Sequence, residues 1–186
     1  MSSADHIAAI DLLRARAFPA APGRSEHGYG GPGFHVAELS THDQMWDDDG
    51  TAHEETELRY EAERDALTVL LSRRWGEPQI FSLTGILVRL LAQEVDGEGE
   101  PVPDPWATLS ESVPDVHLWR ADGHWIAVGV AHWGERLALQ LVAVITEVGG
   151  AGGRGGAGRA AANPQNTQPP TESHTQTHPP PPTQSA

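Results

Sequence analysis

The stretch HLWRADGHWIAVGVAHWGERLALQL, residues 117–141, decides the fold, because its apolar residues recur with a period of two. At its centre, Asp122-Gly123 is the typical signal of a two-residue hairpin turn. The stretch therefore predicts two antiparallel strands. The turn sets three opposed pairs, which are Arg120 with Trp125, Trp119 with Ile126, and His117 with Val128.

A second turn signal, Gly134-Glu135, follows the second strand and predicts a third strand after it. Together the three strands make an antiparallel meander. This turn sets two further pairs, which are His132 with Leu137 and Val130 with Leu139.

The alternation sorts the side chains of the meander onto two faces. One face gathers large apolar residues and is expected to be the core, beginning with Trp119 and Ile126. The other face has small residues on its middle strand between two tryptophans. A trough of this kind admits another backbone or a flat ligand. The candidate binding residues on this face are Arg120, Trp125, Ala127, Gly129, Ala131 and Trp133.

Three interpretations of the trough are compatible with the sequence: ordinary packing, a recognition groove and a catalytic pocket. The N-terminal helix or a second copy of the chain would fill it as ordinary packing. A recognition groove or a catalytic pocket would leave it open. The opposed Arg120 and Trp125 are best interpreted as a cross-strand cation–π pair.

Upstream of the meander, residues 53–75 show apolar spacing of four and seven, with acids in the first turns and Arg73 and Arg74 in the last. They predict a long amphipathic helix that ends at Gly76. Residues 83–94 predict a shorter helix capped by Ser82, whose apolar side, Leu83, Leu87, Leu90 and Leu91, is expected to cover the sheet. A strand within 80–94 stays open, because Gly85 weakens a helix there.

These elements predict an α+β domain over residues 52–148, in which a long and a shorter helix pack on a three-stranded antiparallel β-meander. Residues 1–51 are expected to form an N-terminal arm with one possible helix, from Ser2 to Ala17, and a Gly/Pro/Asp-rich loop. Residues 149–186 are rich in Gly, Pro, Thr and Gln, with almost nothing to bury, and predict a disordered tail.

The formal charge of −14 and the absence of cysteine restrict the function. An acidic chain repels phosphate backbones, so nucleic-acid binding is not expected. The charge suits either a solvated acidic surface that keeps the chain soluble, which is the simpler interpretation, or a basic protein partner. A membrane span needs about 20 apolar residues, and no such run occurs. The N-terminus carries Asp5 and Asp11 where a secretory signal would be basic and then apolar. We therefore expect a cytoplasmic protein.

Neither a metal nor a cofactor is expected. His117, His124 and His132 share one predicted face, but the last two lie about 26 Å apart at roughly 3.3 Å per residue, too far for one zinc ion. The acidic stretch DQMWDDDG, residues 43–50, resembles part of a calcium loop but lacks its first and twelfth ligands.

No spacing typical of a catalytic triad or a metalloprotease motif occurs, so enzyme status is uncertain and not favoured. SRRWGEPQIFSLTGILVRLLA, followed by VPDVHLWR and LVAVITEV, resembles a block found in small proteins of high-GC bacteria. That resemblance implies a recurring small domain over residues 58–148 and no known activity.

The sequence thus favours a non-enzymatic protein-binding or adaptor module that uses the Trp-flanked sheet face. A small enzyme with a pocket between the helices and the sheet edge, and a homodimeric structural domain with facing Trp surfaces, are the alternatives.

Overall fold

A seven-stranded antiparallel sheet forms the centre of the molecule, with strand order β1-β2-β3-β7-β6-β5-β4. The computed structural model of the protein describes residues 2–42, 51–97, 99–132 and 139–150, which all fall within one unit, residues 1–156. Within these residues the helices are α1 (Ser3–Ala15), α2 (Thr51–Trp75), α3 (Thr84–Asp96) and α4 (Trp106–Ser110). The strands are β1 (Gly23–Ser25), β2 (Gly28–Gly31), β3 (Phe34–His42), β4 (Gln79–Ser82), β5 (Asp115–Ala121), β6 (His124–His132) and β7 (Leu139–Thr146).

The predicted fold was wrong in its sheet and its helix count. The chain is α+β, but it has seven strands and four helices in its described part, where the sequence predicted a three-stranded meander and two helices. Three of the added strands come from the N-terminal region that was expected to be an arm. β3 pairs with β7 along its length, from Phe34 opposite Thr146 to His42 opposite Leu139.

Glycine explains why the segment before β3 forms strands although its composition is typical of a loop. Gly28 has a φ of 145°, and a Cβ atom at this position would collide with the carbonyl group of Val36. A Cβ at Gly31 would lie 2.7 Å from the ring of Phe34. The strands β2 and β3 can approach each other here only because these side chains are absent.

The first hairpin is confirmed in its register. Asp122 and Gly123 both have positive φ, 50° and 85°, as a type I′ turn requires. The pairs agree with the prediction: Arg120 with Trp125, Trp119 with Ile126, and His117 with Val128.

The second hairpin is displaced by two residues from the prediction. His132 lies opposite Leu139, where Leu137 was expected, and Val130 lies opposite Leu141. The Gly134-Glu135 turn lies outside the described residues. A shift of two preserves the side-chain alternation, so the described residues of these strands keep their predicted faces.

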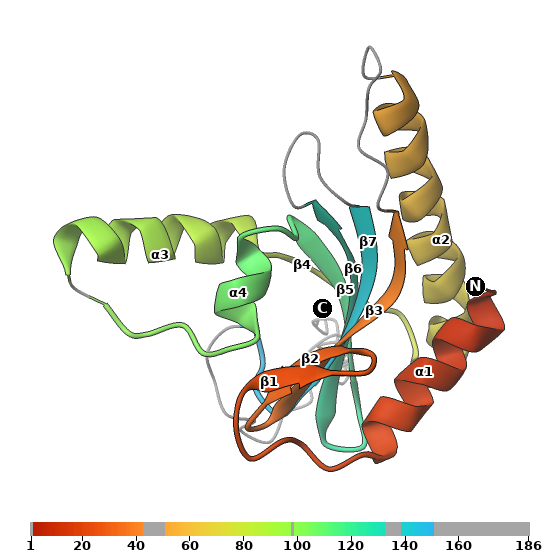
Figure 1. Cartoon of the computed structure of the whole chain (residues 1–186), viewed down its shortest axis with the longest axis horizontal. Coiled ribbons are helices and arrows are strands. Elements are labelled where there is room, and N and C mark those ends of the chain that lie inside the picture. Colours follow the sequence, from red (N-terminus) through yellow and green to blue (C-terminus); the bar gives the residue numbers. More distant parts are fainter. Residues whose placement is uncertain (1, 43–50, 98, 133–138, 151–186) are drawn as a thin grey trace, which may run out of the picture. The chain divides into compact units, whose positions relative to one another are not determined.

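The sheet is covered on both faces, by α1 and α2 on one side and by α3 and α4 on the other (Figure 1). The α1/α2 face packs Ile10, Leu67, Leu71, Trp119 and Ile126 into one apolar cluster. The opposite face packs a second cluster around Trp106, Leu109, Val113, Val116 and Val144.

The predicted helices are present, with one change in capping. α1 has the expected capping box between Ser2 and Asp5. α2 ends before Gly76, whose φ is 83°. Residues 80–94 contain both alternatives, since β4 precedes α3. The cap of α3 is Leu83 without a side-chain hydrogen bond, so the expected cap by Ser82 was wrong.

No helix in the described ranges is long and apolar enough to cross a membrane. The acidic stretch 43–50 and nearly all of the C-terminal tail, residues 151–186, lie outside the described residues.

Candidate functional site

The predicted trough on the middle strand is filled by the chain itself. Ala127 and Ala131 are buried, and a Cβ atom at Gly129 would lie 2.8 Å from Cγ1 of Val113 and 3.0 Å from the carbonyl oxygen of Asp115. The segment that follows α4 therefore sits directly on the small residues of β6. The occupants considered from the sequence, the N-terminal helix and a second copy of the chain, do not fill it; α1 packs on the opposite face.

Hydrogen bonds hold α4 and the segment that follows it against the sheet. The main-chain N–H of His132 donates to the carbonyl of Ser112 at 2.7 Å. The indole N–H of Trp106, a fully buried side chain, donates to the carbonyl of Val148 at 2.8 Å. A partner could reach the trough only after these bonds and the apolar packing beneath α4 were broken.

Of the remaining predicted site residues, the structure describes Arg120 and Trp125, which lie opposite each other on β5 and β6. The guanidinium carbon of Arg120 lies 5.2 Å from the ring centroid of Trp125, which confirms the cation–π pair. Trp125 is half-buried, and a Cβ at Gly149 would lie 3.1 Å from its ring. Trp133 lies outside the described residues. The structure thus brings together Arg120 and Trp125 at the sheet surface but buries the small residues between the two tryptophans.

A second candidate surrounds His117, whose Nδ1 lies 2.7 Å from the hydroxyl oxygen of Thr68. The Thr68 hydroxyl donates to the carbonyl of Arg64 at 2.9 Å. Since the hydroxyl has one proton, Nδ1 of His117 is the donor in the first bond. Burial lowers the pKa of His117, and Arg64 adds to this effect. His117 is therefore a neutral, packed side chain and is not placed as a base for Thr68.

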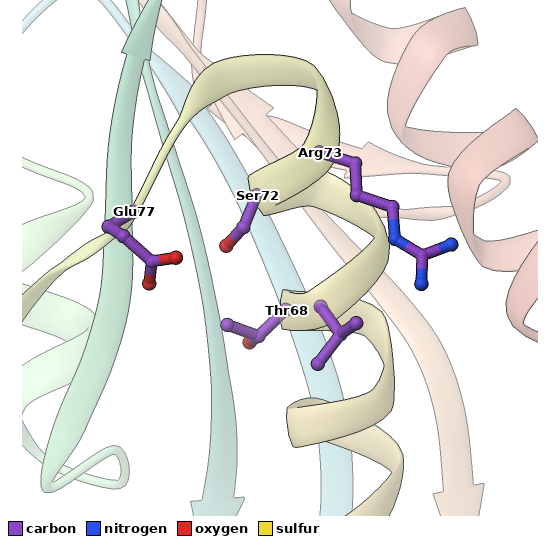
Figure 2. Close-up of a pocket in the computed structure, with 5 residues that line it drawn as sticks. Thr68, Ser72, Arg73 and Glu77 are labelled. Carbon is purple, nitrogen blue, oxygen red and sulfur yellow. The ribbon is translucent and has the colours of Figure 1, made fainter.

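Next to Thr68, a small pocket of about 300 Å³ opens between the C-terminal turns of α2 and the segment leading to β4 (Figure 2). Ser72 and Glu77 point toward each other across it, whereas the guanidinium group of Arg73 points away (Figure 2). Four polar residues line the pocket, Thr68, Ser72, Arg73 and Glu77. The hydroxyl of Ser72 makes no hydrogen bond to Glu77 or to any other described residue, so the two do not form a nucleophile–base pair. Within the described ranges there is also no group of three or more His, Asp or Glu side chains that could hold a metal ion. The pocket therefore gives no support to the enzyme alternative.

The most exposed apolar surface of the described residues lies on α3, which extends outward from the sheet (Figure 1). Leu83 and Ile86 are buried, and the partly buried Leu90 packs against the same core cluster. Further along, Val88, Leu91 and Val95 are 61%, 53% and 84% exposed. An apolar helix that the rest of the chain does not cover typically marks an interaction surface.

A groove of about 510 Å³ runs between α3 and α4. Its walls are mostly apolar, and two carboxylates, Glu94 and Glu111, stand among them. We call it the α3–α4 groove, and the residues that line it are Leu87, Leu90, Leu91, Gln93, Glu94, Ala107 and Glu111.

Main-chain and side-chain hydrogen bonds hold the two helices that form the groove. The N–H of Leu83 donates to the carbonyl of Pro114 at 2.8 Å, which ties the base of α3 to the segment before β5. At the other end, Gly97 adopts the left-handed conformation with φ 67°, and Gln93 donates to the carbonyl of Glu100 at 2.7 Å. The groove is thus a formed feature of the fold and lies on the far side of α4 from the trough.

Sequence reasoning missed this groove because it assigned the apolar side of residues 83–94 to the sheet. Leu83 is buried and Leu90 packs against the core as expected, but Leu87 is only half-buried and Leu91 is exposed. The signal was present in Val88 and Val95, which make α3 apolar on more than one side.

Comparison with protein-family models, with curated proteins and with solved structures gave no match. The assignment of function therefore depends on the geometry of this chain.

Proposed function

We propose that this protein is a non-enzymatic protein-binding module, and that the α3–α4 groove receives an apolar segment of a partner that also carries Lys or Arg. The observation that carries this proposal is the position of Glu94 and Glu111 beside the exposed Leu91 in one groove. An apolar floor with charged groups at its margin is the usual composition of a surface that binds a peptide or a helix.

The apolar part of the groove supplies the binding energy. Leu87, Leu90 and Leu91 present aliphatic surface that the chain leaves at least partly in water. Covering this surface with apolar side chains of a partner removes it from water at about 25 cal/mol per Å². The groove is large enough for one or two such side chains, which favours a short linear segment as the ligand.

The acidic groups select the sign of the partner's charge. Glu94 and Glu111 stand in a chain whose formal charge is −14, so a segment with Lys or Arg is attracted and an acidic one is repelled. A basic partner is one of the two interpretations of the charge that the composition alone leaves open, the other being a solvated acidic surface. It also predicts that binding weakens as the salt concentration rises.

We place the site at the groove and not at the Trp-flanked sheet face, because α4 and the segment after it cover that face. Val113 occupies the space above Gly129, and the indole N–H of Trp106, the first residue of α4, donates to the carbonyl of Val148. The groove, in contrast, is open without any rearrangement of the described residues.

The test is fluorescence anisotropy of two labelled helical peptides, one of leucine and lysine and one of leucine and glutamate, titrated with the full chain. We expect the lysine peptide to bind and the glutamate peptide to bind at least about ten-fold more weakly, since charge complementarity suppresses wrong partners. Ala107→Trp fills the groove and should abolish binding, and Glu111→Gln should weaken it about three-fold.

The matched control is Val69→Trp, which places the same side chain on α2 at a position that is 55% exposed. This variant should bind the lysine peptide as the unaltered chain does. Equal binding by the unaltered chain and by a folded Ala107→Trp variant would contradict the proposal.

A further inference from the structure

The sheet ends at β4, which pairs with β5 on one side only. The N–H of Leu83, the residue after β4, donates to the carbonyl of Pro114 at 2.8 Å, and this bond shows which residues of β4 bond to β5. Every second residue of an antiparallel pair directs its main-chain groups to the neighbouring strand, so Phe81 and Gln79 also bond to β5.

The main-chain N–H and C=O groups of Ile80 and Ser82 consequently point away from the sheet. Both residues are exposed, and their main-chain groups have no hydrogen-bond partner among the described residues. Donors and acceptors with this spacing pair with one kind of ligand, which is another extended main chain.

The two edges of the sheet differ in how they discourage such pairing. β1 at the opposite edge has only three residues, and one of them is the charged Arg24. β4 has no charged residue, and its Ile80 side chain is 69% exposed. An uncharged edge with an exposed apolar side chain is the type to which further strands add.

From these features we infer that β4 binds an extended, basic segment of another protein as an added antiparallel strand. One residue of the segment exchanges two hydrogen bonds with Ile80, and the residue two positions before it does the same with Ser82. The residue two positions after it lies beside Pro78. This edge shares no residue with the lining of the α3–α4 groove, so the inference goes beyond the proposed function.

The side chain opposite Ile80 is expected to be apolar. Ile80 lies opposite His117, whose Nδ1 lies 2.7 Å from the hydroxyl oxygen of Thr68, so Ile80 is on the α2 side of the sheet. Directly opposed residues of an antiparallel pair have their side chains on the same face. A β-branched side chain opposite Ile80 therefore covers apolar surface that the chain leaves in water.

The side chain beside Pro78 is expected to be Lys or Arg. It lies next to Glu77, at the pocket of about 300 Å³ on the flank of α2 (Figure 2). The Ser72 hydroxyl is buried there and has no hydrogen-bond partner among the described residues. Because the Arg73 guanidinium points away, the oxygens of Ser72 and Glu77 are open to accept from a cationic side chain (Figure 2).

The charge at the other end of β4 also favours a basic segment. Asp115 lies opposite Ser82 and shares the guanidinium of Arg64 with Asp65, so one cation serves two carboxylates. A second copy of β4 suits the site less well, since its residues Gln79–Ser82 include no basic side chain and each chain carries a formal charge of −14.

The first experiment is amide hydrogen exchange of the ¹⁵N-labelled full chain with the capped peptide Thr-Val-Thr-Val-Thr-Lys-Thr, read by NMR. Its second valine matches Ile80 and its lysine matches Pro78. We expect the amides of Ile80 and Ser82 to be protected at least about ten-fold more at saturating peptide than in the free chain. Unchanged exchange would overturn the inference. Protection in the free chain that rises with protein concentration would identify a second copy and overturn the partner class.

The second experiment separates main-chain pairing from side-chain contact. N-methylation of the second valine removes the donor to the carbonyl of Ile80 and should abolish binding. The matched control is N-methylation of the threonine that follows, whose N–H points away from β4, and this peptide should bind as the parent does. Equal affinities of the two methylated peptides would overturn strand addition.

Variants of the chain test the basic residue and separate this site from the groove. Glu77→Gln should weaken the lysine peptide about three-fold, and unchanged affinity would overturn the basic partner. Ile80→Pro keeps the bonds to β5, because the lost N–H points outward, and should abolish strand addition. This variant should still bind the helical leucine–lysine peptide, whereas Ala107→Trp should still bind the strand peptide. Loss of one peptide alone in the unaltered chain would refute only the corresponding site.

Discussion

Val113 occupies the space above Gly129: a Cβ atom on the glycine would lie 2.8 Å from Cγ1 of the valine. The contact joins the middle strand of the sheet to the segment that follows α4. It explains why β6 carries glycine at this position, since any side chain here would push that segment off the sheet. The surface left for a partner is then on the outer side of α4 and α3.

Gly129→Ala should destabilise the protein by about 1–3 kcal/mol, because the added methyl group overpacks a closed interface. Chemical denaturation monitored by tryptophan fluorescence measures the loss. A variant with unchanged stability would show that the segment after α4 is not held against β6.

The control for this change is the double variant with Val113→Ala, which removes the methyl group that the new Cβ meets. If the clash is the cause, the double variant should recover part of the stability, and the coupling free energy in the mutant cycle should be at least about 0.5 kcal/mol. Gly85→Ala, where a Cβ meets nothing within 4 Å, should instead stabilise the chain slightly.

Removal of residues 1–51 should prevent cooperative folding. β3 lies between β2 and β7, and Ile10 and Leu39 are buried against the α2 side of the sheet. Without them β7 becomes an open edge and apolar surface faces water. Thermal unfolding followed by near-UV circular dichroism should show a transition for residues 1–150 and none for residues 52–148. A cooperative transition in the shorter chain would contradict the fold described here.

His6 should make the stability depend on pH. Burial lowers the pKa of His6 below its ordinary value of 6.5, and Glu63 opposes this only in part. The folded state therefore holds His6 neutral, while the unfolded chain accepts a proton below about pH 6.5. Neutral His6 therefore contributes to the free energy of unfolding above about pH 6.5, and this contribution is lost as the pH falls toward the pKa of His6 in the folded state.

His6→Gln removes this titration. We expect the free energy of unfolding of the variant to fall less between pH 7 and pH 5 than that of the unaltered chain, by urea denaturation at each pH. Since the pKa of His117 is lowered as well, some slope should remain until His117 is also replaced. Parallel pH profiles for the variant and the unaltered chain would count against this role of His6.

Trp106→Phe should weaken both the fold and the groove. It leaves the carbonyl of the half-buried Val148 without its indole donor, which costs about 0.5–1.5 kcal/mol. The matched change is Trp119→Phe on the other face, where the lost bond is to the carbonyl of Gly76. Both should lower stability, but only Trp106→Phe should reduce peptide binding, because Ala107 beside it lines the groove. Equal effects of the two variants on peptide binding would show that α4 does not form part of the binding site.

Local patterns in the sequence were sufficient to predict those elements that depend on contacts between residues close together in the chain. The Asp122-Gly123 turn fixed the first hairpin, and alternation alone placed Trp119 and Trp125 on opposite faces. The ends of α2 could likewise be predicted, because Gly76 and the charges of the helix termini act within one or two turns.

The pairing of the N-terminal strands and the partner of α3 could not be predicted from such local patterns. Nothing local in the sequence around Gly28 shows that its missing side chain makes room for Val36, so a glycine-rich strand looks like a loop. In the same way, the apolar pattern of α3 predicts a covered face but not which partner covers it. Leu91 was thus assigned to the core, although it is 53% exposed.

The most direct measurement is an NMR titration of the ¹⁵N-labelled full chain with the leucine–lysine peptide. The account predicts amide shifts concentrated at Leu87, Leu90, Leu91, Ala107 and Glu111, with β6 unchanged around Gly129. Shifts centred on β6 and Trp125, or no shifts at saturating peptide, would contradict a binding site between α3 and α4.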